Sequence, residues 1–149
     1  MARIHGLAGL MTTAGGDFIM AYIWICLGSA LGGGCRYWIS GAIARRFGES
    51  FPTGTLVVNV SGCFVIGFLG ALSDPEGRFL VGPVARQFLM VGVLGGYTTF
   101  SSFSLQTLNL AQDGEWLYSG ANVLLSVTLC LVAVWLGHVA GEFLNLKPR

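Results

Sequence analysis

Long apolar stretches alternate with short polar segments along most of the chain. Four windows contain no charged residue: residues 18–35, 50–73, 87–112 and 116–141. A helix needs about 20 apolar residues to cross a bilayer, so each window can supply one span, the first by continuing past Arg36. The pattern predicts an all-α protein with four transmembrane helices. The expected spans cover residues of about 20–44, 54–73, 84–112 and 116–141.

The polar segments between these windows are too short to form a second domain. We expect residues 1–19 to be an N-terminal extension and residues 20–149 to form a single four-span membrane domain. The stretch before Met20 is polar, so both Met1 and Met20 are candidate start residues. A secretory signal is the weaker interpretation of the first window, because the chain stays apolar well beyond its small residues.

Charged residues are too scarce to cover a water-exposed surface. The 149 residues are 54% hydrophobic and only 10% charged, with a mean hydropathy of +0.71. Soluble domains carry about 25% charged residues. The composition therefore excludes an ordinary soluble domain, and the net charge of +1 indicates neither a nucleic acid nor an acidic partner.

The positive charges do not favour one side of the membrane. Arg45 and Arg46 mark the first loop, Arg78 and Arg86 mark the second, and the third loop has no Lys or Arg. An excess of positive charge in cytoplasmic loops normally fixes the orientation of a membrane protein. Because loops on opposite sides both carry Arg, this bias is weak and permits insertion in both orientations.

The cysteines give no sign of a metal site or a disulfide framework. They have no C-x-x-C spacing and no His at metal-ligand distance, which favours small apolar residues packed between helices. All four lie within predicted spans: Cys26, Cys35, Cys63 and Cys130.

The middle of the third predicted span is a poor helix former. Residues 95–104 read Gly-Gly-Tyr-Thr-Thr-Phe-Ser-Ser-Phe-Ser, and paired glycines followed by β-branched threonines disfavour a helix. We expect a break over Gly95–Thr99. Freed backbone groups survive at bilayer depth only when they are buried, line water or hold an ion. The alternative is an unbroken glycine-rich packing helix whose hydroxyls bond to the previous turn.

Polar groups and aromatic rings follow this expected break. Phe100 and Phe103 lie three residues apart on one helical face, and the positive edges of such rings attract a small anion. Ordinary core packing is the alternative interpretation of the pair. Amide and hydroxyl donors would replace the water that the anion loses. The candidate pathway residues are Asn59, Phe100, Phe103, Ser104, Gln106, Thr107 and Ser126.

Acidic residues are absent from the interior of every predicted span. Proton-coupled pumps and cation transporters usually keep a carboxylate inside the membrane, so their absence favours an anion pathway. Arg36, near the end of the first span, either reaches the interface or forms an electropositive vestibule. The acidic residues are Asp17, Glu49, Asp74, Glu76, Asp113, Glu115 and Glu142.

Three motifs together resemble the Fluc (CrcB-type) fluoride channel family. Gly95–Ser104 resembles its G-G-x-T-T-F-S-T-F-S signature, with Ser102 in place of the second Thr. Gly54-Thr-Leu-Val-Val-Asn59 resembles the family's G-T-L-x-x-N, and Arg36-Tyr-Trp matches the Arg-aromatic step of its first span. The motifs occur in the family's order, and the resemblance covers roughly residues 20–141.

The resemblance implies an antiparallel dual-topology homodimer in the cell (inner) membrane, with two fluoride pores. It implies that the ring edges of Phe100 and Phe103 carry fluoride and that Asn59 donates to the ion. It further implies a structural sodium ion, held by backbone carbonyls of Gly95 and Thr98 from both subunits, and a vestibule at Arg36. The expected function is passive, fluoride-selective export without enzymatic chemistry.

Besides Ser102, the chain departs from the family pattern at three positions. Ser126 fits the first position of a polar track on the fourth span, but Cys130 and Val134 stand where Ser and Thr are expected. Gln106 stands where Glu is common. Two other functions remain: a small dual-topology drug or cation antiporter, which needs a membrane-embedded Glu that this chain lacks, and a non-transporting assembly subunit, which leaves the expected break unexplained.

Overall fold

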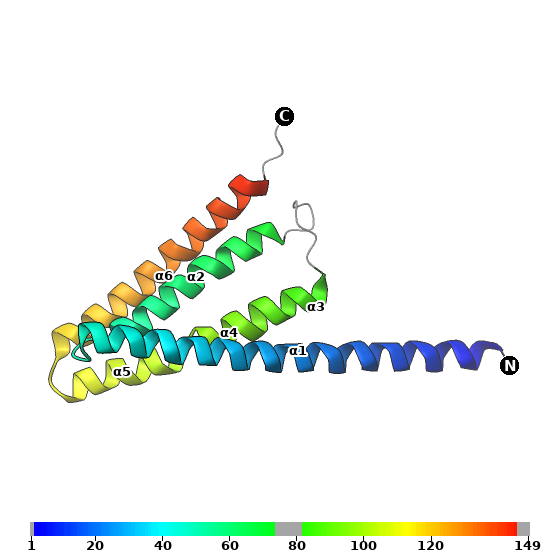
Figure 1. The fold of residues 1–149 in the computed structure, drawn as a ribbon, viewed down its shortest axis with the longest axis horizontal. Coiled ribbons are helices and arrows are strands. Elements are labelled where there is room, and N and C mark those ends of the chain that lie inside the picture. Colours follow the sequence, from blue (N-terminus) through cyan, green and yellow to red (C-terminus); the bar gives the residue numbers. More distant parts are fainter. Residues whose placement is uncertain (1, 74–81, 146–149) are drawn as a thin grey trace.

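The computed structural model describes residues 2–73 and 82–145. All elements in these ranges are helical, and four stretches are long and apolar enough to cross a membrane. This confirms the prediction of an all-α protein with four spans (Figure 1). The helices are α1 (Ala2–Phe47), α2 (Thr53–Leu72), α3 (Pro83–Arg86), the π-helix η1 (Gln87–Leu94), α4 (Gly95–Tyr97), α5 (Phe100–Gln112) and α6 (Trp116–Asn145).

The first helix is longer than predicted. It begins at Ala2 rather than near residue 20, so the boundary expected after the 1–19 extension is not a helix boundary. No proline falls between Ala2 and Phe47 to stop the helix. At 1.5 Å per residue it is about 70 Å long, more than twice the apolar thickness of a bilayer. The candidate span within it is Phe18–Phe47.

The third span consists of several helical segments. The helical run from Pro83 through α3, η1 and α4 ends at Tyr97, and α5 begins at Phe100. Between them, Thr98 (φ −77°, ψ 155°) and Thr99 (φ −150°, ψ 115°) have extended backbone. The interruption is narrower than expected, because Gly95 and Gly96 remain helical.

Close backbone contacts hold the spans together. The third span packs on α1, where a Cβ at Gly96 would lie 2.5 Å from the Ser29 carbonyl oxygen. The second and fourth spans, α2 and α6, lie side by side (Figure 1). Membrane helices associate largely through such small-residue contacts, because lipid provides no hydrophobic driving force between them.

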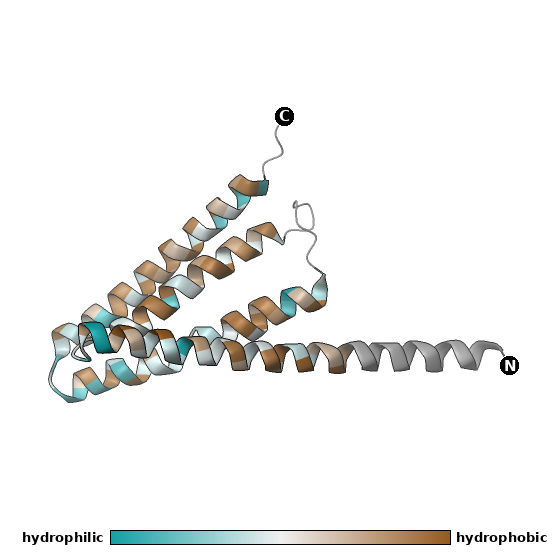
Figure 2. Cartoon of the chain, viewed as in Figure 1, coloured by the Kyte–Doolittle hydropathy of each residue, from teal (hydrophilic) through white to brown (hydrophobic). Residues whose placement is uncertain are grey.

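Most apolar side chains face away from the chain itself. Only 11–28% of the residues in each span window are buried inside the protein. Apolar residues cover most of α2 and α6, whereas hydrophilic residues gather near the end where α1 meets α2 (Figure 2). These exposed apolar faces suit contact with lipid or with another membrane protein.

Candidate functional site

The candidate site is built around the extended residues between α4 and α5. Asn59, on α2, pairs with both backbone polar groups of Thr99: its Nδ2 donates to the Thr99 carbonyl at 3.0 Å, and the Thr99 amide donates to its Oδ1 at 2.8 Å. The side chain thus satisfies both backbone polar groups of Thr99, for which lipid offers no partner. One of the two N–H donors of Asn59 Nδ2 is left for another acceptor.

The Thr99 side chain caps the start of α5. Its Oγ1 accepts from the Ser102 backbone amide at 3.2 Å and donates to the Ser102 hydroxyl at 3.1 Å. Thr is among the preferred residues at a helix N-cap. From the sequence, Thr99 was predicted only as part of the break, although its residue type was a signal for a cap. The cap directs the partly positive N-terminus of α5 toward the interruption.

A groove of about 360 Å³ opens beside the interruption. Phe103 is buried, with 9% of its surface exposed, whereas Phe100 is 78% exposed. Their ring centroids lie 5.3 Å apart, with the ring planes inclined at 52°. The two rings are therefore neighbours, as predicted, but Phe100 projects out of the chain. Side chains lining the groove include Asn59, Cys63, Phe100, Phe103, Ser126 and Cys130.

Three predicted pathway residues do not line this groove: Ser104, Gln106 and Thr107. The Ser104 hydroxyl donates to the Phe100 carbonyl at 2.9 Å, and the Thr107 hydroxyl donates to the Phe103 carbonyl at 2.7 Å. Both hydroxyl hydrogens are thus used within α5. Thr107 instead connects α5 to α6, because its Oγ1 accepts from Asn122 Nδ2 at 2.8 Å.

Asn122 joins this connection to the groove. It is almost fully buried, and its Oδ1 accepts from the Ser126 hydroxyl at 3.4 Å. Ser119 adds a hydrogen bond from its hydroxyl to the Thr107 carbonyl at 3.0 Å. Sequence analysis missed the role of Asn122, because the register between α5 and α6 decides which polar residues meet. Its position within an apolar span was the available signal.

A second, larger cavity of about 780 Å³ also reaches Thr99. Arg36 and Gln106 both line this cavity, and the vestibule role of Arg36 stays a prediction. Among the described residues, Gln106 Oε1 is one of two buried side-chain polar atoms without a hydrogen-bond partner. Thr99 thus borders both the larger cavity and the groove that contains the two phenylalanines.

The departures from the motif pattern fall in different places. Cys130 lines the groove, whereas the Val134 backbone packs against Gly67 of α2. Gln106 lines the larger cavity. Of these three residues, only Cys130 therefore changes the lining of the groove.

The backbone near Gly95 offers oxygen ligands for a cation. In a continuous helix the Thr99 amide would donate to the Gly95 carbonyl, but here it donates to Asn59. Gly95 is exposed at the protein surface, and both Gly95 and Thr98 line the groove. Residues 18–73 and 82–145 contain no group of three or more His, Cys, Asp and Glu residues placed to bind a metal. The donors present are backbone oxygens, which suit a hard cation such as sodium.

Comparison with known proteins identifies relatives of the chain. The model of the family described as "CrcB-like protein, Camphor Resistance (CrcB)" matches residues 23–138. A fluoride-specific ion channel FluC from Opitutus terrae is 61% identical over 124 residues, covering 83% of this chain and 94% of that protein. Another protein of the same name, from Methylocella silvestris, is 57% identical over 126 residues, covering 85% of this chain and 96% of that protein.

A third FluC, from Rhodospirillum rubrum, is 57% identical over 126 residues and covers 85% of this chain and 98% of its own length. The matched residues include all the motifs from which the resemblance was read. They also include the interruption at Thr98–Thr99 and both cavities beside it. The chain belongs to the CrcB-like protein family.

Proposed function

We propose that this protein is a fluoride-specific ion channel that lets fluoride leave the cell passively, down its electrochemical gradient. Relatives that are 57–61% identical to the chain carry the name of such a channel. The observation that carries the proposal is the groove beside Thr99, where Asn59, two phenylalanine rings and Ser126 face one space. The channel role requires no enzymatic chemistry.

The groove suits a small anion for electrostatic reasons. The free N–H of Asn59 and the ring edges of Phe100 and Phe103 present positive partial charge. The capped N-terminus of α5 adds to it. Among the described residues, no Asp or Glu lines the groove to repel an anion. Fluoride is small and strongly hydrated, so several weak donors replace its water without holding it as tightly as a fixed Arg would.

A second copy of the chain would complete this pathway. The groove is open on one side, Phe100 is 78% exposed and Gly95 lies at the surface. We infer a homodimer in which the partner covers these residues. The weak charge bias of the loops supports an antiparallel arrangement, with the two subunits inserted in opposite orientations in the cell (inner) membrane.

A sodium ion at the centre of this dimer fits the exposed backbone. The carbonyl of Gly95 lacks its helical donor, and Thr98 follows the C-terminal end of α4, where the helix dipole favours a cation. Carbonyls from both subunits would together supply the all-oxygen ligation that a hard cation prefers. The ion would stabilise the assembly and would not be transported.

Two other functions fit the structure less well. A drug or cation antiporter needs a carboxylate within the membrane. In the described residues, the only acidic side chain within a candidate span is Glu142, and it lies near the end of α6. A non-transporting assembly subunit would have no use for the extended residues at Thr98–Thr99, or for the donors that surround them.

Fluoride efflux from liposomes tests the proposal. Vesicles loaded with potassium fluoride and containing the purified protein should release fluoride to an electrode when valinomycin is added, because potassium then balances the charge. Empty vesicles and chloride-loaded vesicles are the controls. Release no faster than from empty vesicles would reject the channel function. Release that requires a proton gradient would indicate coupled transport and would also reject a passive channel.

A further inference from the structure

Two cysteines on neighbouring helices, α2 and α6, line the same groove. A Cβ at Gly67 would collide with the Val134 carbonyl and lie 3.1 Å from the His138 amide nitrogen, so α2 packs closely on α6 at this level. Cys63 and Cys130 lie one helical turn before Gly67 and Val134 on the same two helices. Both are half-buried, both are free thiols and both line the groove. The two thiols are close enough to interact with each other.

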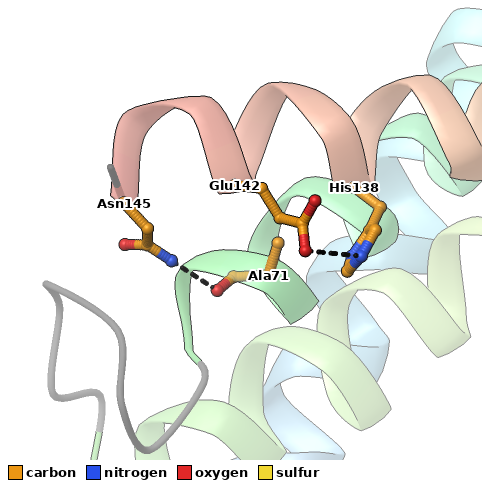
Figure 3. Close-up of polar contacts among 4 residues, drawn as sticks. All are labelled: Ala71, His138, Glu142 and Asn145. Carbon is orange, nitrogen blue, oxygen red and sulfur yellow. Dashed lines mark hydrogen bonds and ion pairs between the residues drawn. The ribbon is translucent and has the colours of Figure 1, made fainter. Parts of the chain in front are cut away.

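The far end of the same helix pair is joined by a side-chain hydrogen bond. Asn145 Nδ2, on α6, donates to the Ala71 carbonyl of α2 at 2.7 Å (Figure 3). Beside it, His138 Nε2 lies 3.3 Å from Glu142 Oε1 along α6 (Figure 3). Together with the close contact at Gly67, the bond from Asn145 ties α2 to α6 on the C-terminal side of both cysteines.

The sulfur chemistry of the groove points to a soft cation. Thiolates and thioethers prefer soft metals, and Met90 also lines the groove. A mercuric ion binds two thiolates in a linear arrangement: two S–H bonds break, two Hg–S bonds form and two protons leave to water. No oxidant is needed, and the product is neutral, which avoids placing a charge within the membrane. Zinc would need about four ligands, of which this pair supplies two.

We propose that Cys63 and Cys130 form a chelating site for a soft, thiophilic d¹⁰ cation, and that its occupation obstructs the groove. The cysteine pair lies one turn along α2 and α6 from Asn59 and Ser126, which line the same groove. A metal bridging the thiols would occupy the space through which the anion is proposed to pass. The binding claim stands on its own, whereas the obstruction of flux rests on the proposed function.

Metal retention against a competing thiol tests the binding claim. The reduced full-length protein is titrated with mercuric chloride in excess 2-mercaptoethanol, and mercury is measured by thiolate absorbance in the ultraviolet and by protein mass. A chelating pair should retain mercury about 100-fold better than a single thiol, because the second thiol is held near the metal at a high effective concentration. Cys63→Ser and Cys130→Ser should each remove this advantage. The double variant Cys26→Ser/Cys35→Ser should keep it, because both of those cysteines are exposed on α1.

Loss of retention in the Cys26/Cys35 variant, or equal retention by all variants, would overturn the chelating site. Fluoride efflux gives the second readout: mercuric chloride should stop efflux through the wild type and the Cys26/Cys35 variant but not through Cys63→Ser or Cys130→Ser. Zinc chloride should have no effect. Tight mercury binding with unchanged efflux would overturn the obstruction. Absence of efflux before any metal is added would reject the proposed function and leave the binding result intact.

Discussion

Replacing Asn59 with leucine tests the central contact of the site. The substitution keeps a side chain of similar size and removes both hydrogen bonds to Thr99, at 2.8 and 3.0 Å. Hydrogen bonds between membrane helices contribute about 0.6–1.7 kcal/mol each. The two bonds together therefore correspond to about 1–3 kcal/mol, or roughly a five- to 150-fold change in an equilibrium constant.

Hydrogen–deuterium exchange at the Thr99 amide measures this change directly. In the wild type the amide donates to Asn59 Oδ1, and in Asn59→Leu it has no partner on α2. Its exchange should accelerate by about tenfold or more, since 1.4 kcal/mol corresponds to a factor of ten. Fluoride efflux should fall in the same variant, because the groove loses a donor and the position of Thr99 is no longer fixed.

Ser61→Ala is the matched control. Ser61 lies two residues further along α2, and its hydroxyl shares a hydrogen bond of 2.9 Å with the Tyr97 hydroxyl, outside the groove. This variant also removes an interhelical bond but leaves Asn59 and Thr99 untouched. If Asn59→Leu and Ser61→Ala show the same exchange rate at Thr99 and the same efflux, the reasoning about the interruption is wrong.

Three further outcomes are expected. Phe100→Ile and Phe103→Ile should each reduce fluoride efflux. Phe103→Ile should also lower the stability of the subunit fold by about 1–2 kcal/mol, because Phe103 is buried within the chain, whereas Phe100→Ile should weaken the proposed dimer that covers it. Equal losses of subunit stability would contradict this. Gly137→Ala should destabilise the protein by about 1–3 kcal/mol in denaturant unfolding, since the added methyl collides with the Phe64 carbonyl. Gly120→Ala, in open space, is its neutral control. Replacing sodium with N-methylglucamine should shift the dimer toward monomer in glutaraldehyde cross-linking, and an unchanged dimer fraction would count against the sodium site.

The spans were predictable because bilayer thickness constrains them directly. A charged residue within the apolar layer is costly, so the charge-free windows mark the helices. The N-terminal boundary was not predictable in this way. A helix continues past the membrane wherever nothing stops it, and the segment before Phe18 contains no proline. Hydropathy locates the span, and the helix around it can be longer.

The position of the interruption was predicted only approximately. Low helix propensity favoured a break from Gly95 onward, but Gly96 remains helical because it packs against Ser29 of α1. Close packing rewards a glycine within a helix and outweighs its low propensity. The extended backbone falls instead where Asn59 is available to satisfy Thr99. That partner is 40 residues away in the sequence, so local patterns do not reveal it.

Two departures from the family pattern, Gln106 and Cys130, line different cavities. We therefore expect each to have its own physical effect. Gln106 lies with Arg36 in the larger cavity, where an amide in place of a carboxylate removes a negative charge. Cys130 lines the groove, where a thiol in place of a hydroxyl is a weaker hydrogen-bond donor. In the proposed fluoride pathway, the first change favours the approach of the anion and the second disfavours its passage through the groove. Asn59 keeps one N–H donor in the groove, whereas the Ser126 hydroxyl already donates to Asn122.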